Sequence, residues 1–565
     1  MRWYPVVPTL LGHRQLIQTL GGRGACAKTD KVPLMATPSR RSAPWVLLAA
    51  SGLSLAFAWA LASPVGASPD EPAHVWYAWG TVTGQTLVNE HLITIPGEKA
   101  TRTRVRIPQK LLQHTDPKCY MAKPGRPTTA CSPIPADNGQ LVTRGSYMNR
   151  YPPLYYGLEG AVMRAGVAAN LSGPRVLYGA RLASAILSWL AVVFGVFLLS
   201  RRFPARVVLL ATLLALPAMT WFLAASVNPN GLEIAAAFLL AAGVLSMRFD
   251  FAAGLRSVTA VVAVPLGTLL LAWTRPLSWV WAALILALLL VPTGPQDGRS
   301  WRQRLPVRRL GAAATAATVL VLASSVVWFG YALQIRSLEQ ANVNPAGWAG
   351  LNPLERVTLL LLGAGSMASE QIGNFGWADT PLPTVAVIAW VAVAGVAAAA
   401  WGMGRHTLVP RWSLGTVLGL GYLAALLDEY LGGWGWQGRY LLPVTAAVCV
   451  LAVPGLMCGL ERWTASRRMV SWMLVVLMAV NALSVLWFLF RNVYGVMDLS
   501  LRRLPATPLP VGTPSWTPPL GQGVVFALVT LAFACGVVAV WTLQPVPANV
   551  PGDAATRPDE RRGST

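Results

Sequence analysis

The sequence has 565 residues, of which 54% are hydrophobic and only 12% charged, with a formal net charge of +23. Because soluble proteins carry about 25% charged residues, this composition excludes an ordinary soluble domain, a disordered chain and a small disulfide-rich scaffold. It also excludes a basic nucleic-acid binder, since so apolar a chain lacks the solvated surface of one. The composition predicts an all-α polytopic membrane protein that contacts membrane lipids and binds no nucleic acid.

The chain begins with a basic segment, residues 1–43, which is expected to be a disordered cytoplasmic tail, and Met35 is an alternative start. Beyond it, apolar stretches recur that approach the roughly 20 residues a helix needs to cross the hydrocarbon core. We predict about twelve spans, at residues 44–63, 176–200, 205–226, 230–248, 257–273, 276–293, 312–335, 383–403, 412–430, 440–460, 469–490 and 521–543. They form one membrane domain, 44–543, followed by a disordered cytoplasmic tail, 544–565.

Lys and Arg gather in alternate connections between these spans. Arg40 and Arg41 precede the first span, Arg201 and Arg202 follow the second, and further arginines follow the sixth, eighth and tenth. Short positively charged loops stay on the cytoplasmic side, so both termini are predicted to be cytoplasmic. A cleavable signal peptide is the alternative for the first span, because residues 60–62 resemble a cleavage site, but the leader is too long for one.

Three longer segments then fall on the outer side, at residues 64–175, 337–382 and 491–520, and the first and largest is expected to carry interfacial helices. Cys119 and Cys131 lie in that first segment with eleven residues between them. The oxidising environment outside the cytoplasm favours a disulfide between them. The segment also holds twelve Lys and Arg against seven acidic residues, an excess that would attract anionic lipid carriers.

An acidic motif opens the large outer segment. In Pro69-Asp70-Glu71-Pro72-Ala73-His74, two adjacent carboxylates and a histidine follow directly on the first span. Such a set could act as a general base or bind a divalent cation. The alternative is a solvated turn in which Asp70 caps the interfacial helix that follows. The residues by themselves leave both readings open.

Polar residues also cluster at the outer ends of the spans, where a charge is costly and commonly marks a site. Snorkelling toward the headgroups is the alternative for each one alone, and an interfacial aromatic belt is the alternative for Tyr151 in the Tyr-Pro-Pro stretch. The residues concerned are Tyr151, Arg181, Asn228, Asn230, Arg275, Gln437, Arg439 and Tyr440. None of the charged ones is predicted at mid-span, as a proton relay or an ion path would require.

The order of these motifs resembles a bacterial membrane-protein family known as domain of unknown function 2142. The resemblance rests on Asp-Glu-Pro-x-His, Tyr-Pro-Pro-Leu-Tyr, Asn-Pro-x-Gly, Arg-Pro and Gln-Gly-Arg-Tyr-Leu-Leu-Pro, which run from about residue 44 to 460. Asn230 departs from the family, which tends to have Asp there. The resemblance implies a multi-pass protein of the bacterial plasma membrane.

That family in turn resembles the glycosyltransferase-C superfamily, whose members have an essential acidic motif in a large first outer loop. The resemblance implies transfer of a sugar, with inversion, from a polyprenyl-phosphate carrier to a glycan or protein acceptor of the cell envelope. Asp70 would be the base or would bind Mg²⁺ or Mn²⁺, with Glu71 as its partner. Arg439, with Arg275 or Arg181, would hold the donor phosphate, and His74, Tyr151, Gln437 and Tyr440 would shape the sugar pocket.

Two other classes of function stay open at this point. A lipid or polysaccharide transporter would be expected to show mid-membrane charge or broken helices in repeated halves, and the sequence shows no internal repeat. A non-catalytic envelope assembly protein is the second alternative. The sequence has no HExxH, GxSxG or Walker motif, so zinc-hydrolase, serine-hydrolase and ATP-driven mechanisms have no support.

Overall fold

The computed structural model describes residues 42–543 apart from 87–91, 95–100, 113–138, 254, 256, 292–307, 309, 341–350, 405–407, 433–436, 464–466 and 496–515. Cys119 and Cys131, the tail residues 1–41 and 544–565 and most of the third outer segment therefore lie outside the described residues. The predictions made for them remain predictions.

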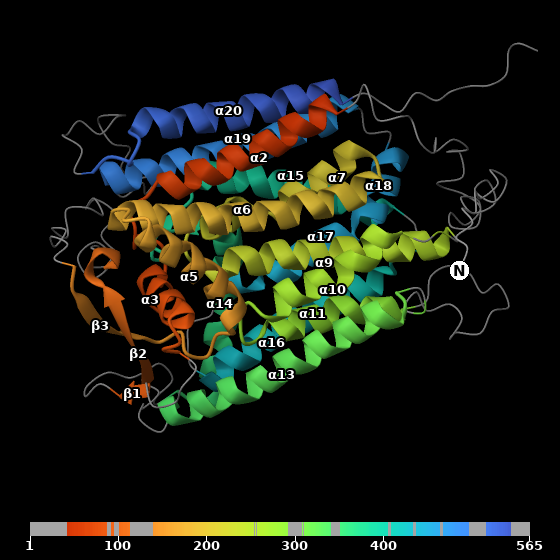
Figure 1. The fold of residues 1–565 in the computed structure, drawn as a ribbon. Helices are drawn as coiled ribbons and strands as arrows, with labels where there is room; N and C mark the ends of the chain where they lie inside the picture. The colour runs from red at the N-terminus through yellow and green to blue at the C-terminus, as the bar shows by residue number, and fades with distance from the viewer. Residues whose placement is uncertain are drawn as a thin grey trace, which may run out of the picture.

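Every apolar stretch in the sequence forms helix, and the helices lie side by side in one bundle (Figure 1). In chain order they are α2 (Ala43–Leu61), α6 (Gly173–Ser200), α7 (Ala205–Ala215), α8 (Ala218–Ala224), α9 (Pro229–Ala252), α10 (Val258–Ala272), α11 (Ser278–Ala287), α13 (Ala312–Gln340), α15 (Thr384–Met403), α16 (Arg411–Gly432), α17 (Leu442–Leu451), α18 (Val453–Arg462), α19 (Arg467–Val493) and α20 (Gln522–Thr542). Helix α9 is the central one, because 94% of its most apolar stretch of 18 residues is buried inside the protein.

Seven of the described helices are long and apolar enough to cross a membrane, or nine if each of two bent pairs counts as one span. Helices α7 and α8 meet at 70°, and the pair that joins Gly438–Leu451 to Val453–Arg462 bends by 50°. Pro217 precedes α8 and Pro454 lies in the first turn of α18, and proline lacks the N–H that a continuous helix needs. Helices α10, α11 and α16 are shorter apolar helices.

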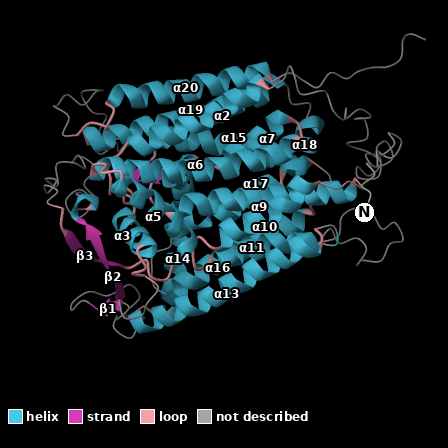
Figure 2. Cartoon of the chain, in the orientation of Figure 1, coloured by secondary structure: helices cyan, strands magenta, loops and turns pink. Residues whose placement is uncertain are grey.

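The first segment predicted to lie on the outer side, residues 64–175, forms in its described part a small layered unit at one end of the bundle (Figure 2). Helix α3 (Glu71–Val82) packs on α5 (Pro153–Ala168), which packs on α6. An antiparallel sheet covers α3, with β2 (Thr101–Pro108) between β1 (Leu92–Thr94) and β3 (Leu141–Ser146), and η3 (Gln109–Leu111) follows β2. Val105 and Ile107 of β2 are buried in the apolar cluster beneath the sheet.

The second segment predicted to lie on the outer side, 337–382, contains a helix for which the sequence analysis made no prediction, α14 (Pro353–Gly373). Asn352 and Glu355 form a capping box at its start, with Pro353 in its first turn, which is a strong helix-initiation signal. A two-stranded hairpin follows, β4 (Asn374–Phe375) and β5 (Thr380–Pro381), and α14 packs on η7 (Gly438–Leu441). This arrangement brings the second outer segment to the start of α17.

Candidate functional site

Asp70 lies at the start of α3 in a strained backbone conformation. Its φ of 60° is in the left-handed region, which costs free energy in a residue other than glycine and is often found at functional sites. Its side chain does not cap the helix. Instead, the Tyr147 hydroxyl donates a 2.7 Å hydrogen bond to Oδ1, and Nη2 of Arg439 lies 3.6 Å from Oδ2. The carboxylate, 30% exposed, is thus held by distant segments of the chain.

Arg439 is a buried charge beside Asp70, and part of its hydrogen-bonding capacity is unused among the described residues. Its side chain is 3% exposed, and its Nε and Nη1 have no hydrogen-bond partner among the described residues. Nη2 donates to the Tyr440 hydroxyl at 3.2 Å and forms the 3.6 Å ion pair with Asp70. Because an unpaired buried donor is costly, these N–H groups are suited to an anion that binds there.

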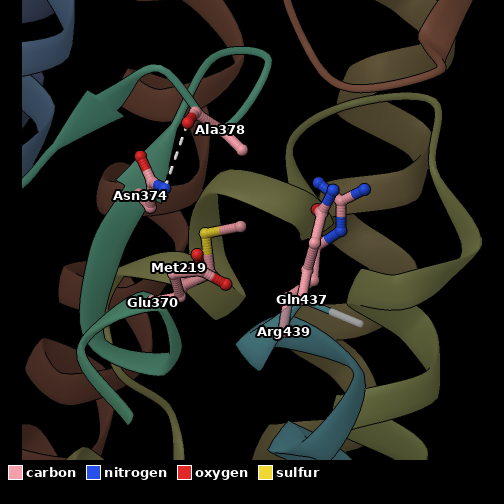
Figure 3. Close-up of a pocket in the computed structure, with 6 residues that line it drawn as sticks. All are labelled: Met219, Glu370, Asn374, Ala378, Gln437 and Arg439. Atoms are coloured by element: carbon pink, nitrogen blue, oxygen red, sulfur yellow. Dashed lines mark hydrogen bonds between the residues drawn. The ribbon is translucent and has the colours of Figure 1, made fainter. Parts of the chain in front are cut away.

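A narrow pocket opens beside Arg439 (Figure 3). Residues of the second outer segment line one side of it, and Gln437 and Arg439 line the other. Oε1 of Gln437 and Oδ1 of Asn374 are buried without a partner among the described residues. The full lining is Met219, Glu370, Asn374, Ala378, Gln437 and Arg439.

Arg275 joins the same cluster from the turn between α10 and α11. Its guanidinium carbon lies 4.4 Å from the Tyr440 ring centroid and 5.8 Å from that of Tyr151, and Arg439 lies 5.1 Å from the Tyr440 ring. Nη1 of Arg275 donates to Glu233 at 3.4 Å. The structure therefore brings together Asp70, both arginines and both tyrosines, as the sequence analysis expected of a shared site.

Glu71 points away from this cluster into a buried ion pair with Arg181. Arg181 donates to both carboxylate oxygens, at 2.7 and 2.6 Å, and both side chains are 0% exposed. The backbone N–H groups of Gly66 and Val227 donate to the same carboxylate. Burial alone would raise the pKa of Glu71, but the Arg181 charge and these hydrogen bonds bring it below its ordinary value.

Arg181 also donates to the carbonyls that end α2, and this explains its depth in the fold. Its Nη1 reaches the carbonyls of Ala60 and Ser63, and its Nη2 reaches that of Pro64. Glu71 and Arg181 together therefore fix the turn between α2 and α3. The hydrogen bonds of Glu71 and Arg181 given above all go to other groups of the protein. Little of either side chain is therefore left to bind a substrate.

His74 lies behind the cluster, 2% exposed, with Nδ1 2.8 Å from the Tyr156 hydroxyl. Its ring is 5.8 Å from the stacked Tyr156 ring and 5.7 Å from that of Tyr151. Burial lowers the pKa of His74 to about 3, with Asp70 opposing the shift and the charges of Arg275 and Arg439 adding to it. The imidazole is therefore neutral at physiological pH.

Asn228, the residue before α9, bonds to two backbone groups. Asn228 caps α9 by accepting from the N–H of Asn230, and its Nδ2 donates to the carbonyl of Pro69 at 3.1 Å. Asn230 is also buried. Asn228 thus stabilises the turn that presents Asp70.

The sequence analysis missed Tyr147 and the pocket residues of the second outer segment, Glu370 and Asn374, as site residues. Trp377, in the hairpin of that segment, donates to the carbonyl of Gly66 at 3.2 Å, so this hairpin touches the turn before Asp70. The aromatic stretch around Tyr151 could have drawn attention to Tyr147. The pairing of β3 with β2 that positions it was not apparent in the sequence.

The acidic motif does not fit a divalent cation in this arrangement. Mg²⁺ and Mn²⁺ prefer several oxygen ligands, but both oxygens of Glu71 accept from Arg181 and a guanidinium lies beside Asp70. Among the described residues, no group of three or more His, Cys, Asp and Glu side chains could hold a metal ion. We therefore derive no step through a metal.

Gly438 is required where η7 meets α14. A Cβ there would collide with the carbonyl of Met367 and with Glu370, whose carboxylate accepts from the Gly438 N–H at 2.8 Å. We expect Gly438→Ala to push η7 off α14, to displace Arg439 and to lower stability by about 1–3 kcal/mol. Thermal unfolding monitored by tryptophan fluorescence would measure this loss.

Gly365→Ala is the matched control for that change. A Cβ at Gly365, within α14, meets nothing within 4 Å, and alanine favours helix over glycine by about 0.5–1 kcal/mol. This variant should unfold at the same temperature as the parent or slightly higher. Equal destabilisation by the two substitutions would show that the η7–α14 contact is not the cause.

Three solved structures resemble this fold at low sequence identity. The ArnT protein of Cupriavidus metallidurans bound to undecaprenyl phosphate is 15% identical, with a TM-score of 0.41, over 88% of this chain and 77% of that one. The Archaeoglobus fulgidus oligosaccharyltransferase with Zn and sulfate is 15% identical (TM-score 0.36; 80% and 53% covered). The oligosaccharyltransferase AglB from the same organism, with an inhibitory peptide and a dolichol-phosphate, is 14% identical (TM-score 0.33; 80% and 56% covered).

This chain thus spans little more than half the length of the archaeal enzymes. No curated protein matches its sequence. A family model described as a predicted membrane protein, DUF2142, matches residues 53–448, which is more than half of the chain and includes the Asp70, Arg181, Arg275 and Arg439 positions. The protein therefore belongs to the DUF2142 family of predicted membrane proteins.

Proposed function

We propose that the protein is an inverting membrane glycosyltransferase that moves a sugar from a polyprenyl-phosphate carrier to an acceptor of the bacterial cell envelope. The observation that carries the proposal is the meeting of one partly exposed carboxylate, Asp70, with Arg439, whose buried Nε and Nη1 lack partners among the described residues. A displacement at an anomeric carbon needs one base and a stabilised phosphate leaving group. This cluster offers both in one place.

In the proposed reaction, Asp70 accepts the proton of an acceptor hydroxyl as its oxygen attacks the anomeric carbon of the donor sugar. The bond between that carbon and the phosphate oxygen breaks, and the electron pair leaves with the polyprenyl phosphate. The Nε and Nη1 groups of Arg439 stabilise the charge that develops on the phosphate, since the N–H groups of a charged guanidinium form strong hydrogen bonds with phosphate oxygens. Arg275 adds positive charge from the other side of Tyr440.

The remaining predicted residues divide into two groups. Tyr151, Gln437, Tyr440 and His74 would shape the sugar pocket, His74 as a neutral ring held by Tyr156. Glu71, Arg181 and Asn228 would be positioning residues, because their described hydrogen bonds hold the turn that presents Asp70. In this proposal Asp70 alone is the base.

A lipid-linked donor also implies a particular membrane topology for the protein. We propose twelve spans in the bacterial plasma membrane, both termini cytoplasmic and the Asp70 cluster at the outer ends of the helices. With each bent pair counted as one span, the nine candidate spans and the three shorter apolar helices of the described residues are enough for this count. The cluster then lies near the outer headgroups, where a polyprenyl phosphate places its anionic head.

Arg439→Gln tests the phosphate role directly. With purified protein in nanodiscs and a panel of short-chain polyprenyl-phosphate sugars, we expect release of polyprenyl phosphate to fall about 10²-fold, the scale of losing one charge-stabilising donor group. Arg462→Gln, an exposed arginine at the end of α18, is the control and should keep full activity.

Two results would count against the proposal. Equal release by Arg439→Gln and the parent would remove Arg439 from the reaction. The second is a parent that releases no polyprenyl phosphate from any donor, together with an Arg439→Gln variant that loses envelope function in cells. That result would favour a transporter or an assembly protein over a transferase.

A further inference from the structure

A row of arginines on the outermost sheet starts beside Asp70. In β2, Arg102, Arg104 and Arg106 alternate with three buried residues that face α3. Since successive strand residues point to opposite faces, the three arginines share the face turned away from α3. Arg104 and Arg106 are exposed, and their side chains form no hydrogen bond or ion pair within the described part of the chain.

The row is connected to the site through Tyr147. The Arg102 guanidinium carbon lies 5.4 Å from the Tyr147 ring centroid, and the Tyr147 hydroxyl donates to Asp70 at 2.7 Å. Arg104 and Arg106 follow two and four residues further along the strand, at steps of about 7 Å. The positive charges therefore extend outward from the carboxylate roughly in a line.

We propose that this arginine track (Arg102, Arg104 and Arg106) binds an anionic acceptor glycan, one that carries uronic-acid carboxylates or phosphate groups at regular intervals. Guanidinium groups bind such anions through paired hydrogen bonds. A line of evenly spaced cations matches a chain of spaced anions better than a single headgroup. The track lies on the face of β2 turned away from α3, which favours a polymer over a lipid surface.

The purpose of the track rests on the proposed function, because a glycan held there would have its end close to the Asp70 base. Its binding chemistry does not rest on it and can be measured alone. The inference therefore specifies the acceptor as an anionic polymer and leaves the donor unchanged.

The test measures binding of fluorescent oligogalacturonate to the full-length protein in nanodiscs of neutral lipid. We expect the double variant Arg104→Glu/Arg106→Glu to bind at least about tenfold more weakly at low salt, with the difference shrinking as salt is added. The double variant Arg164→Glu/Arg175→Glu changes the net charge equally at two other exposed arginines of the outer segment and should bind like the parent. An uncharged dextran oligomer should bind none of the three proteins tightly.

Three outcomes would overturn the inference. Equal weakening by both double variants would indicate a general charge effect. No binding of oligogalacturonate by the parent would exclude the polymer. Loss of binding to anionic vesicles with unchanged binding of oligogalacturonate would assign the track to lipid. If Asp70→Asn kept full activity while the track variant still lost glycan binding, the proposed function would fail and the binding surface would stand.

Discussion

The Asp70→Asn variant is expected to lose at least about 10³-fold in sugar transfer while it folds as the parent does. A positioned general base contributes about 10²–10⁴-fold to a rate, and asparagine removes the base while keeping the shape of the side chain. Asparagine also tolerates the left-handed backbone that residue 70 adopts, with φ at 60°. The measurement is release of polyprenyl phosphate, with thermal unfolding recorded on the same preparation.

Tyr147→Phe is the companion to that variant. It removes only the 2.7 Å hydrogen bond to Asp70, so we expect a smaller loss of transfer, within about tenfold, because the carboxylate keeps its charge and loses one of the groups that orient it. Full envelope function in a strain that carries only Asp70→Asn would contradict catalysis at this residue and would favour an assembly role.

The Glu71→Gln variant is expected to lose about 3–5 kcal/mol of stability, the cost of leaving a buried charge without its partner. Arg181 would keep its positive charge at 0% exposure with a neutral amide in place of the carboxylate. The midpoint of unfolding in sodium dodecyl sulfate mixed micelles measures the loss. The folded fraction should retain transfer activity, because Glu71 holds the turn and does not touch the substrate.

Two comparisons isolate the ion pair. Glu355→Gln, in the exposed capping box of α14, should cost at most about 1 kcal/mol. The double variant Glu71→Gln/Arg181→Gln should cost less than the sum of its single variants, because no unpaired charge remains. Strictly additive losses would mean that the two side chains do not stabilise each other.

The same ion pair predicts an acid-sensitive fold. The folded pKa of Glu71 lies below its ordinary value of 4.5, so the folded state binds fewer protons than the unfolded state near that pH. The stabilisation is therefore fully present above about pH 4.5 and is lost as pH falls through the folded pKa. Glu71→Gln should remove this part of the acid sensitivity.

Much of the helical framework was predictable, because membrane helices consist of long apolar runs that the sequence shows directly. Every predicted span is helical, and the resemblance to the DUF2142 family is confirmed. The breaks at Pro217 and Pro454 were less predictable, since packed helices often tolerate proline without bending. Helix α14 was missed because its apolar run, residues 359–362, is far shorter than a membrane span, whereas its capping signal at Asn352 is local and readable.

At the site, residue types were predictable but their partners were not. Two adjacent carboxylates, Asp70 and Glu71, look equivalent in the sequence, yet they point in different directions because they begin a helix at consecutive positions. Only the fold shows that Arg181 pairs with Glu71 and that Arg439 lies beside Asp70. Those pairings join residues more than a hundred positions apart, and no local pattern specifies them.

The groups that hold Asp70 come from widely separated parts of the sequence, and this has a consequence for biosynthesis. The turn before α3 is fixed by Asn228 and by Trp377, and the carboxylate meets Arg439. A chain emerging from the ribosome inserts these segments one after another. Asp70 therefore meets Arg439 only after most of the protein has been inserted. Under the proposed function, an incomplete or prematurely terminated chain would therefore be inert toward donor lipids in the membrane into which it is being inserted.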